Sequence, residues 1–235
     1  MNTILAMTTR MIPAVATKGR IIAMLLIGAA GIAIGVLLRR ADASSSDMVE
    51  FTALFGLTIF VPLVALVIAT ASLGSLVEDE TLIYFWLRPI GRWQISVASL
   101  LAGFAVLVPL ILVPMGVLGA VTGDSSALRG ILVGSLVGLV AYTSVFTMLG
   151  LFTQRALAWG LLYVLVWEGL VAGFSRRAGW LAIRTYADGA LARAGDTTGR
   201  IANPPESSTI IIVTVAVSVV CFAITTWRLN NMTVD

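Results

Sequence analysis

Six long apolar runs dominate the sequence and restrict what it can fold into. They cover residues 21–38, 51–77, 95–121, 129–153, 157–174 and 209–227. A helix needs about 20 residues to cross the roughly 30 Å hydrocarbon core of a bilayer, so each run predicts a transmembrane helix. The runs are continuously apolar and lack the alternation of a membrane β-barrel. We therefore expect an all-α integral membrane protein, a single domain with six membrane-spanning helices.

The composition agrees with this class of protein. Of the 235 residues, 59% are hydrophobic and 11% are charged, whereas soluble domains are about 45–50% apolar and about 25% charged. Most basic residues lie between the apolar runs, where Lys and Arg set membrane orientation. The net charge of +3 therefore does not indicate binding to nucleic acid. The abundance of Ala, Gly and Val is typical of a GC-rich bacterial genome.

Missing residue types exclude several kinds of chemistry. The chain has no histidine and one cysteine, Cys221, which excludes His–Cys zinc sites, Ser-His-Asp triads and an intramolecular disulfide. Its one lysine, Lys18, is not part of a nucleotide-binding P-loop. The stretch from Asp188 to Arg193 matches half of a CDP-alcohol phosphatidyltransferase signature, but the downstream acids have the wrong spacing. We expect no enzyme activity, metal or cofactor in this chain.

Two segments outside the runs have helical patterns. Residues 1–20 alternate apolar and polar side chains and are too short to span, which predicts an interfacial amphipathic helix that Pro13 bends or ends. In the long connection 175–208, one apolar face recurs at spacings of 3, 4 and 4 residues. This spacing predicts a short interfacial helix. The residues of that face are Trp180, Ile183, Ala187 and Leu191.

Glycines and prolines recur within the runs. Gly31 with Gly35, and Gly134 with Gly138, have the spacing of close helix–helix contacts, within one chain or between subunits. Prolines remove a helical hydrogen bond, so we expect kinks where they lie. The prolines inside spans are Pro62, Pro109 and Pro114.

The segment 78–93, between the second and third runs, carries the most information about function. Three acids open it, and Pro89 and Gly91 close it, which predicts a short helix over about 79–87 outside the membrane. The helix is dense in aromatic and aliphatic residues, and an exposed apolar surface of this kind usually meets a partner. The alternative is a helix resting on lipid headgroups, with Trp86 and Trp93 at the membrane surface.

This segment resembles the coupling segment in permease subunits of type-2 ABC transporters, the ABC exporter-type family. That pattern has Thr-Leu, then Leu-x-x-x-Pro, then a small residue, Arg and an aromatic residue. The residues that carry the resemblance are Thr81-Leu82 and Leu87-Arg88-Pro89-Ile90-Gly91-Arg92-Trp93, with Leu87 two residues before Pro89 where the pattern has four. The chain departs from the pattern at Glu80, where the family often has Gly, and at Ala98-Ser99, where Gly-Lys is common.

The resemblance implies a permease subunit of an ATP-driven ABC exporter in the cell membrane. It implies a dimer with a second copy or a paralogue, and two cytoplasmic ATPase subunits that bind ATP and Mg. It also implies cytoplasmic termini, a cytoplasmic coupling helix and an extracytoplasmic 175–208 connection with short helices. The residues expected at the ATPase interface are Glu78, Asp79, Glu80, Thr81, Leu82, Phe85, Trp86, Leu87, Arg88, Pro89 and Arg92.

Glu168 is an acid well inside the fifth run. A charge at the centre of a membrane costs about 2.5–3.5 kcal/mol on insertion scales, so this side chain must be neutral, paired or hydrated. It lines a translocation path or a dimer contact, or it bonds to Arg176, Arg177 or a neighbouring backbone. The alternative function is an ATPase-independent ion- or proton-coupled carrier or channel that uses Glu168.

Basic residues alone do not fix the orientation, because seven lie on the N-terminal side and eight on the other. The resemblance places the N-terminus inside. We therefore predict that reporter fusions at Arg40 and Gly195 read outside and that fusions at Gly91 and Asp235 read inside. An inside reading at Gly195 would contradict the resemblance.

Overall fold

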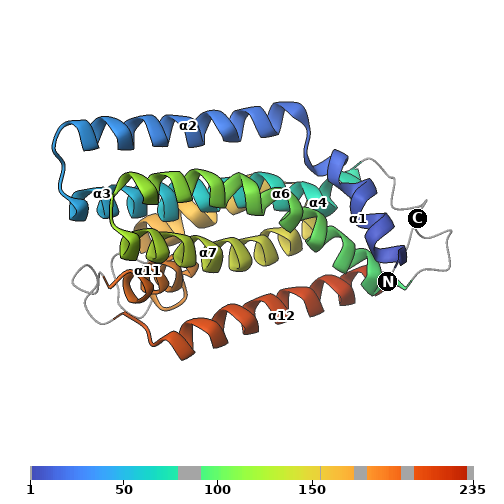
Figure 1. The fold of residues 1–235 in the computed structure, drawn as a ribbon. Helices are drawn as coiled ribbons and strands as arrows, with labels where there is room; N and C mark the ends of the chain where they lie inside the picture. Colours follow the sequence, from blue (N-terminus) through green and yellow to red (C-terminus); the bar gives the residue numbers. More distant parts are fainter. Residues whose placement is uncertain (1, 79–90, 154, 172–178, 197–203, 232–235) are drawn as a thin grey trace.

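The computed structural model describes residues 2–78, 91–153, 155–171, 179–196 and 204–231, and within these ranges every regular element is a helix (Figure 1). The predicted all-α class is confirmed for this part of the chain. The α-helices are α1 (Asn2–Val15), α2 (Lys18–Arg40), α3 (Ser45–Thr52), α4 (Val61–Glu78), α6 (Arg92–Val121), α7 (Ser125–Phe152), α8 (Ala156–Leu162), α11 (Ile183–Ala194) and α12 (Ser207–Asn231). Two π-helices, η1 (Ala53–Phe60) and η2 (Tyr163–Val171), continue α3 and α8.

Five helical segments of 23–29 residues are long and apolar enough to cross a membrane. Five of the predicted runs coincide with them. The remaining run, 157–174, falls on α8 and η2, where the apolar helix Ala156–Leu170 is shorter than these five. The five long segments are Lys18–Arg40, Ser45–Ser72, Trp93–Val121, Ser125–Phe152 and Ser207–Asn231.

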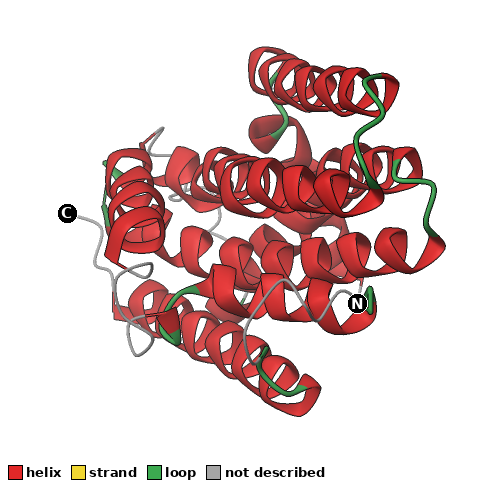
Figure 2. Cartoon of the chain, turned by 90° about the vertical axis from the view of Figure 1, so that its left-hand side faces the viewer, coloured by secondary structure: helices red, strands yellow, loops and turns green. Residues whose placement is uncertain are grey.

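Helix α7 lies at the centre of the bundle and packs against α4, α6, α8, α11 and α12. Its Tyr142 and Phe146 side chains are fully buried, and their rings stack with centroids 5.7 Å apart. Helices α2 and α12 lie at opposite edges of the bundle (Figures 1 and 2) and expose large apolar side chains such as Leu26 and Ile211. Surfaces this apolar are compatible with a multi-pass membrane protein.

Local sequence explains where two helices begin. Ser44 and Asp47 form a reciprocal capping box at the start of α3, in which each side chain accepts a hydrogen bond from the other residue's N–H. Helix α7 begins after Asp124, whose carboxylate accepts from the N–H of Ser126 at 2.9 Å. The hydrogen bonds from Ser126 lower the pKa of the Asp124 carboxyl. The preceding turn contains Gly123 at φ 75°, a backbone conformation that favours glycine.

The predicted glycine pairs lie at helix contacts within this chain. A Cβ on Gly134 would lie 2.7 Å from the carbonyl oxygen of Ala187, so α11 approaches the backbone of α7 directly. Gly35 likewise leaves room for Leu118 of α6. The small residues therefore allow close packing inside one subunit.

The prolines have different local consequences. Helix α6 runs without interruption through Pro109 and Pro114. Pro62 is the second residue of α4, which directly follows the π-helix η1. Because Pro62 cannot donate to the carbonyl four residues earlier, the regular α-helical hydrogen bonding is already broken at this point. Pro13 lies inside α1, which ends two residues later at Val15.

Helix α1 packs onto one end of the bundle, which we call the α1 end. Its Met7 and Met11 are buried against the first turns of α6, the last turn of α7 and the last turn of α12. The predicted amphipathic helix is thus present, with its apolar face on protein. The residues that receive it are Ile95, Ala98, Ala102, Leu151 and Leu229.

Helix α11 is the helix predicted in the long connection, but it does not lie flat at a surface. Its Ile183, Ala187 and Leu191 are buried in the main core, as the spacing predicted, whereas Trp180 precedes the helix and is 47% exposed. Successive residues of α11 meet successively earlier residues of α7: Ala187 lies at Gly134 and Leu191 at Gly130. The helix therefore runs antiparallel to α7 along the first half of that span.

We predict that Gly134→Ala destabilises the fold by about 1–3 kcal/mol, because the new methyl group overpacks a backbone contact. Gly116→Ala is the matched control, since its Cβ would meet Leu132 at an ordinary 3.6 Å. There the higher helix propensity of Ala should leave stability unchanged or raise it by up to about 1 kcal/mol. The buried thiol of Cys221 reports unfolding with a thiol-reactive dye during heating. Equal melting temperatures for the two variants would contradict the close α7–α11 contact.

Candidate functional site

The Glu168 side chain is buried where three helical segments meet. It lies on η2, is 3% exposed, and reaches Tyr142 of α7 and the beginning of α11. Tyr142 is 17 residues beyond the start of α7 at Ser125, about 25 Å along the axis at 1.5 Å per residue. The carboxylate is therefore held near the middle of a helix of membrane-spanning length.

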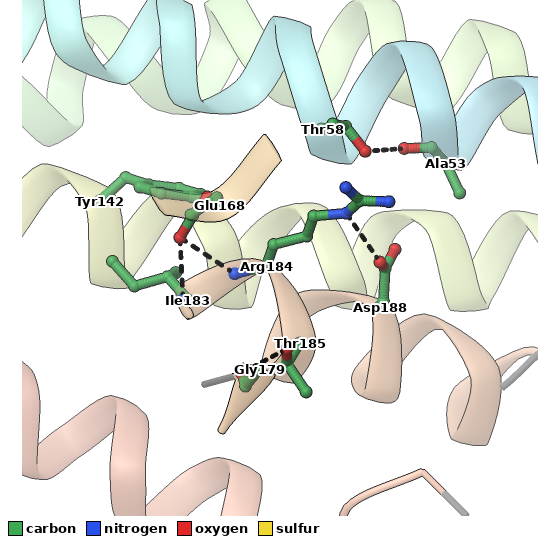
Figure 3. Close-up of polar contacts among 9 residues, drawn as sticks. All are labelled: Ala53, Thr58, Tyr142, Glu168, Gly179, Ile183, Arg184, Thr185 and Asp188. Carbon is green, nitrogen blue, oxygen red and sulfur yellow. Dashed lines mark hydrogen bonds and ion pairs between the residues drawn. The ribbon is translucent and has the colours of Figure 1, made fainter. Parts of the chain in front are cut away.

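Four hydrogen-bond donors surround this carboxylate, and the residues that supply three of them, Tyr142, Ile183 and Arg184, are drawn in Figure 3. The Tyr142 hydroxyl donates to Oε2. The Tyr163 hydroxyl donates to Oε1 at 3.0 Å, and the backbone N–H groups of Ile183 and Arg184 donate to the same oxygen at 2.9 and 3.4 Å. An ionised carboxylate only accepts hydrogen bonds, so this set of donors suits it.

The two backbone donors are the first N–H groups of α11. These groups have no partner inside a helix and are usually satisfied by the side chain of the N-cap residue. Here the N-cap is Ala182, which has no such side chain. Glu168 supplies the missing acceptor from another segment, and its negative charge also suits the positive end of the helix dipole. The carboxylate thus joins η2 to α11.

The π-helical geometry of η2 brings two of the partners together. Tyr163 and Glu168 are five residues apart, a spacing that an α-helix would place on different faces. A π-helix bonds residue i to residue i+5, so residues five apart lie one above the other. The π-helix therefore lets one turn of the chain supply both the acid and a donor.

A second polar pair lies on the first two turns of α11. Arg184 and Asp188 form an ion pair at 3.3 Å, with side chains 27% and 13% exposed. The Arg184 side chain extends toward the segment that carries Ala53 and Thr58, which belong to the other π-helix, η1 (Figure 3). Both π-helices thus lie beside the same polar cluster, and π-helical turns are frequent at functional sites.

The structure brings together only part of what the sequence predicted. Glu168 bonds to a neighbouring backbone, one of the roles expected for it, whereas Arg176 and Arg177 lie outside the described residues. Glu78 ends α4 and Arg92 begins α6. The predicted coupling helix over 79–87, and the remaining interface residues from Asp79 to Pro89, lie outside the described residues, so their contacts stay predictions.

Sequence reasoning missed the partners of Glu168. Tyr142 and Tyr163 lie in apolar runs and were not predicted as site residues, although a buried tyrosine hydroxyl usually has a hydrogen-bond partner. Arg184 and Asp188 read as the polar side of a surface helix, because the pattern gives periodicity and not depth. One signal was available: Ala182 precedes a helix without offering a capping side chain.

No family model matches this chain, and no curated protein matches its sequence. Its function is therefore inferred from the polar cluster, the helix arrangement and the sequence pattern.

We predict that Glu168→Ala lowers the unfolding free energy by about 2–5 kcal/mol, because each buried donor left without an acceptor costs about 1–3 kcal/mol. Glu168→Gln keeps one carbonyl acceptor for the N–H groups of α11 and should cost about 1 kcal/mol. Glu50→Gln, at an exposed acid of α3, is the control and should cost nothing measurable. Thermal unfolding of the purified protein by circular dichroism measures all three. A wild-type melting temperature for Glu168→Ala would contradict the capping role.

Proposed function

We propose that this chain is the transmembrane permease subunit of an ATP-driven ABC exporter. In this proposal it spans a bacterial cell membrane six times, has both termini in the cytoplasm, and pairs with a second copy or a paralogue. Two separate ATPase subunits bind ATP and Mg and dock on the segment 78–93. The proposal rests on the resemblance of that segment and on the arrangement of the described helices.

The observation that carries the proposal is the convergence of helix ends at the α1 end. Helix α4 ends at Glu78 and α6 begins at Arg92. The first turns of α6 pack with α1 and with the last turn of α12. The connection between α4 and α6 therefore starts and finishes beside the N-terminal helix and the end of the last helix (Figure 1). A coupling segment next to cytoplasmic termini is the arrangement that the resemblance implies.

The crossing formed by the fifth run is interrupted in this proposal. The α8–η2 segment begins at the α1 end and reaches Glu168 at the level of Tyr142, and α11 continues from that level along the first half of α7. Non-helical backbone at membrane depth is tolerated where it is buried in protein. The Glu168 cap would hold the two pieces in line, so the pair together would cross the membrane.

Close contacts at the α1 end would pass motion of the coupling segment into the bundle. A Cβ on Gly150 of α7 would lie 2.5 Å from the carbonyl oxygen of Thr70 on α4, so the two backbones nearly touch. The Leu66 side chain of α4 fills the space left by Gly160 of α8. Each of these contacts has a glycine on one side, so no side chain there can adjust to absorb a displacement. A shift of α4 would therefore move α7 and α8 with it.

The alternative function is a carrier or channel that works without an ATPase and binds a proton or cation at Glu168. The burial of this carboxylate and its four donors favour a structural role over ion binding. Among the described residues, no group of three acidic or cysteine side chains gathers into a metal site. The two functions differ in whether transport requires the partner and ATP.

We predict that Phe85→Asp abolishes co-purification of the ATPase, because burying an unpaired charge costs several kcal/mol. Glu80→Lys is the comparison variant: an acid at the rim should slow association and leave the complex intact. The measurement is co-purification from cells that express the permease with the ATPase encoded beside it, together with the ATPase rate of the complex.

Retention of the partner and of full ATPase activity by Phe85→Asp would overturn the coupling role of the segment. ATP-independent transport by purified wild-type protein in vesicles would favour the carrier instead. Circular dichroism shows whether each variant is still folded, which distinguishes loss of the ATPase contact from unfolding of the permease.

A further inference from the structure

The ion pair between Arg184 and Asp188 is partly exposed near the middle of the bundle. Nε of Arg184 lies 3.3 Å from Oδ2 of Asp188, one turn further along α11, and the two side chains are 27% and 13% exposed. The Glu168 cap uses only the backbone N–H of Arg184 and leaves both charged side chains out. The cap therefore does not account for this pair.

The depth of the pair follows from its neighbours on α7. The backbone N–H of Arg184 donates to the carboxylate that Tyr142 also reaches, about 25 Å from the start of α7. Ala187, directly before Asp188, lies at Gly134, about 14 Å from that start. The hydrocarbon core of a membrane that α7 spans is about 30 Å thick. Both charged side chains therefore lie within that core.

The Arg184 guanidinium has more donors than the protein satisfies. A guanidinium carries five N–H groups. Among the described residues only its Nε has an acceptor, the Asp188 carboxylate. The terminal nitrogens extend toward η1, where the Thr58 side chain lies on the side facing them (Figure 3). Polar groups without hydrogen bonds are costly in apolar surroundings, so these donors require water or another polar partner.

Lipid does not suit this surface. Charged side chains inside spans almost always face the bundle interior or a water-filled cavity. An arginine near a helix end can extend to the membrane surface, whereas the Arg184 side chain is directed to an acid at the same depth. Apolar side chains form the rest of the exposed surface here. Ile59 of η1 is 53% exposed, and Leu170, two residues after Glu168, is 57% exposed.

We propose that the Arg184–Asp188 pair faces water, so that this side of α11 is a hydrated surface at membrane depth. Water supplies acceptors for the free donors of Arg184 and lowers the cost of both charges. Such a surface gives a hydrophilic molecule a place near the middle of the bundle without contact with lipid. It serves transport with or without an ATPase, so the proposal does not rest on the exporter function.

Cysteine accessibility tests the proposal in a Cys221→Ser background, which removes the one native thiol. The protein is reconstituted in liposomes, and freeze–thaw supplies the water-soluble cation MTSET on both sides, so that orientation does not affect the result. The reactive form of a thiol is the thiolate, which apolar surroundings disfavour. Arg184→Cys and Thr58→Cys should therefore react at least about tenfold faster than the controls Leu170→Cys and Ile59→Cys. The two control positions are the more exposed ones.

Modification of Arg184→Cys gives a second measurement. The thiol forms a disulfide with the reagent and releases methanesulfinate, which places a positive charge opposite Asp188 again. The substitution should lower the melting temperature measured by circular dichroism, and MTSET should raise it back toward that of the background protein. Methyl methanethiosulfonate adds a neutral group to the same thiol and should leave the melting temperature low.

Thr58→Cys keeps both charges of the pair, so it decides the test if circular dichroism shows that Arg184→Cys is unfolded. A folded Arg184→Cys, or in its place Thr58→Cys, that reacts as slowly as Ile59→Cys would overturn the proposal. Disulfide-linked dimers of Arg184→Cys would also overturn it, because they would show that a second copy covers the pair. Neither outcome would affect co-purification of the ATPase, which tests the exporter function separately.

Discussion

The hydrogen bonds from the first N–H groups of α11 to the Glu168 carboxylate are the interaction on which the centre of this bundle depends. A helix that begins inside a bundle must satisfy those groups without water, since each buried donor left without a partner costs about 1–3 kcal/mol. The carboxylate must in turn be paired, because a bare charge is equally costly. Each group removes the penalty of the other, and together they fix η2 against α11.

Close packing around this interaction makes the geometry possible. Gly130 and Gly134 let α11 approach α7 until backbone atoms meet, which brings Ile183 to the level of Tyr142. The π-helical turn of η2 then aligns Tyr163 with Glu168. A polar cluster of this kind, fully supplied with donors, rigidifies its surroundings.

The sequence predicted the parts of the fold that depend on periodicity and length. Five apolar runs, the amphipathic α1 and the buried face of α11 follow from spacing alone. How deeply a helix is buried does not follow from the spacing of its apolar residues. A short helix with one apolar face has the same sequence pattern at a membrane surface as it has between spans. Glu168 was recognisable because an acid in an apolar run is unusual. Tyr142 acquires its role only when η2 folds back beside α7, and Tyr163 only when η2 adopts its π-helical turn.

Amide hydrogen exchange at Ile183 and Arg184 tests the capping interaction most directly. The first N–H groups of a helix ordinarily exchange fast, because they lack partners within the helix. The account predicts slow exchange of both amides in the wild-type protein. In Glu168→Ala it predicts fast exchange at these two positions while the amides around Tyr142 of α7 stay protected. Fast exchange of Ile183 and Arg184 in the wild-type protein would contradict the account.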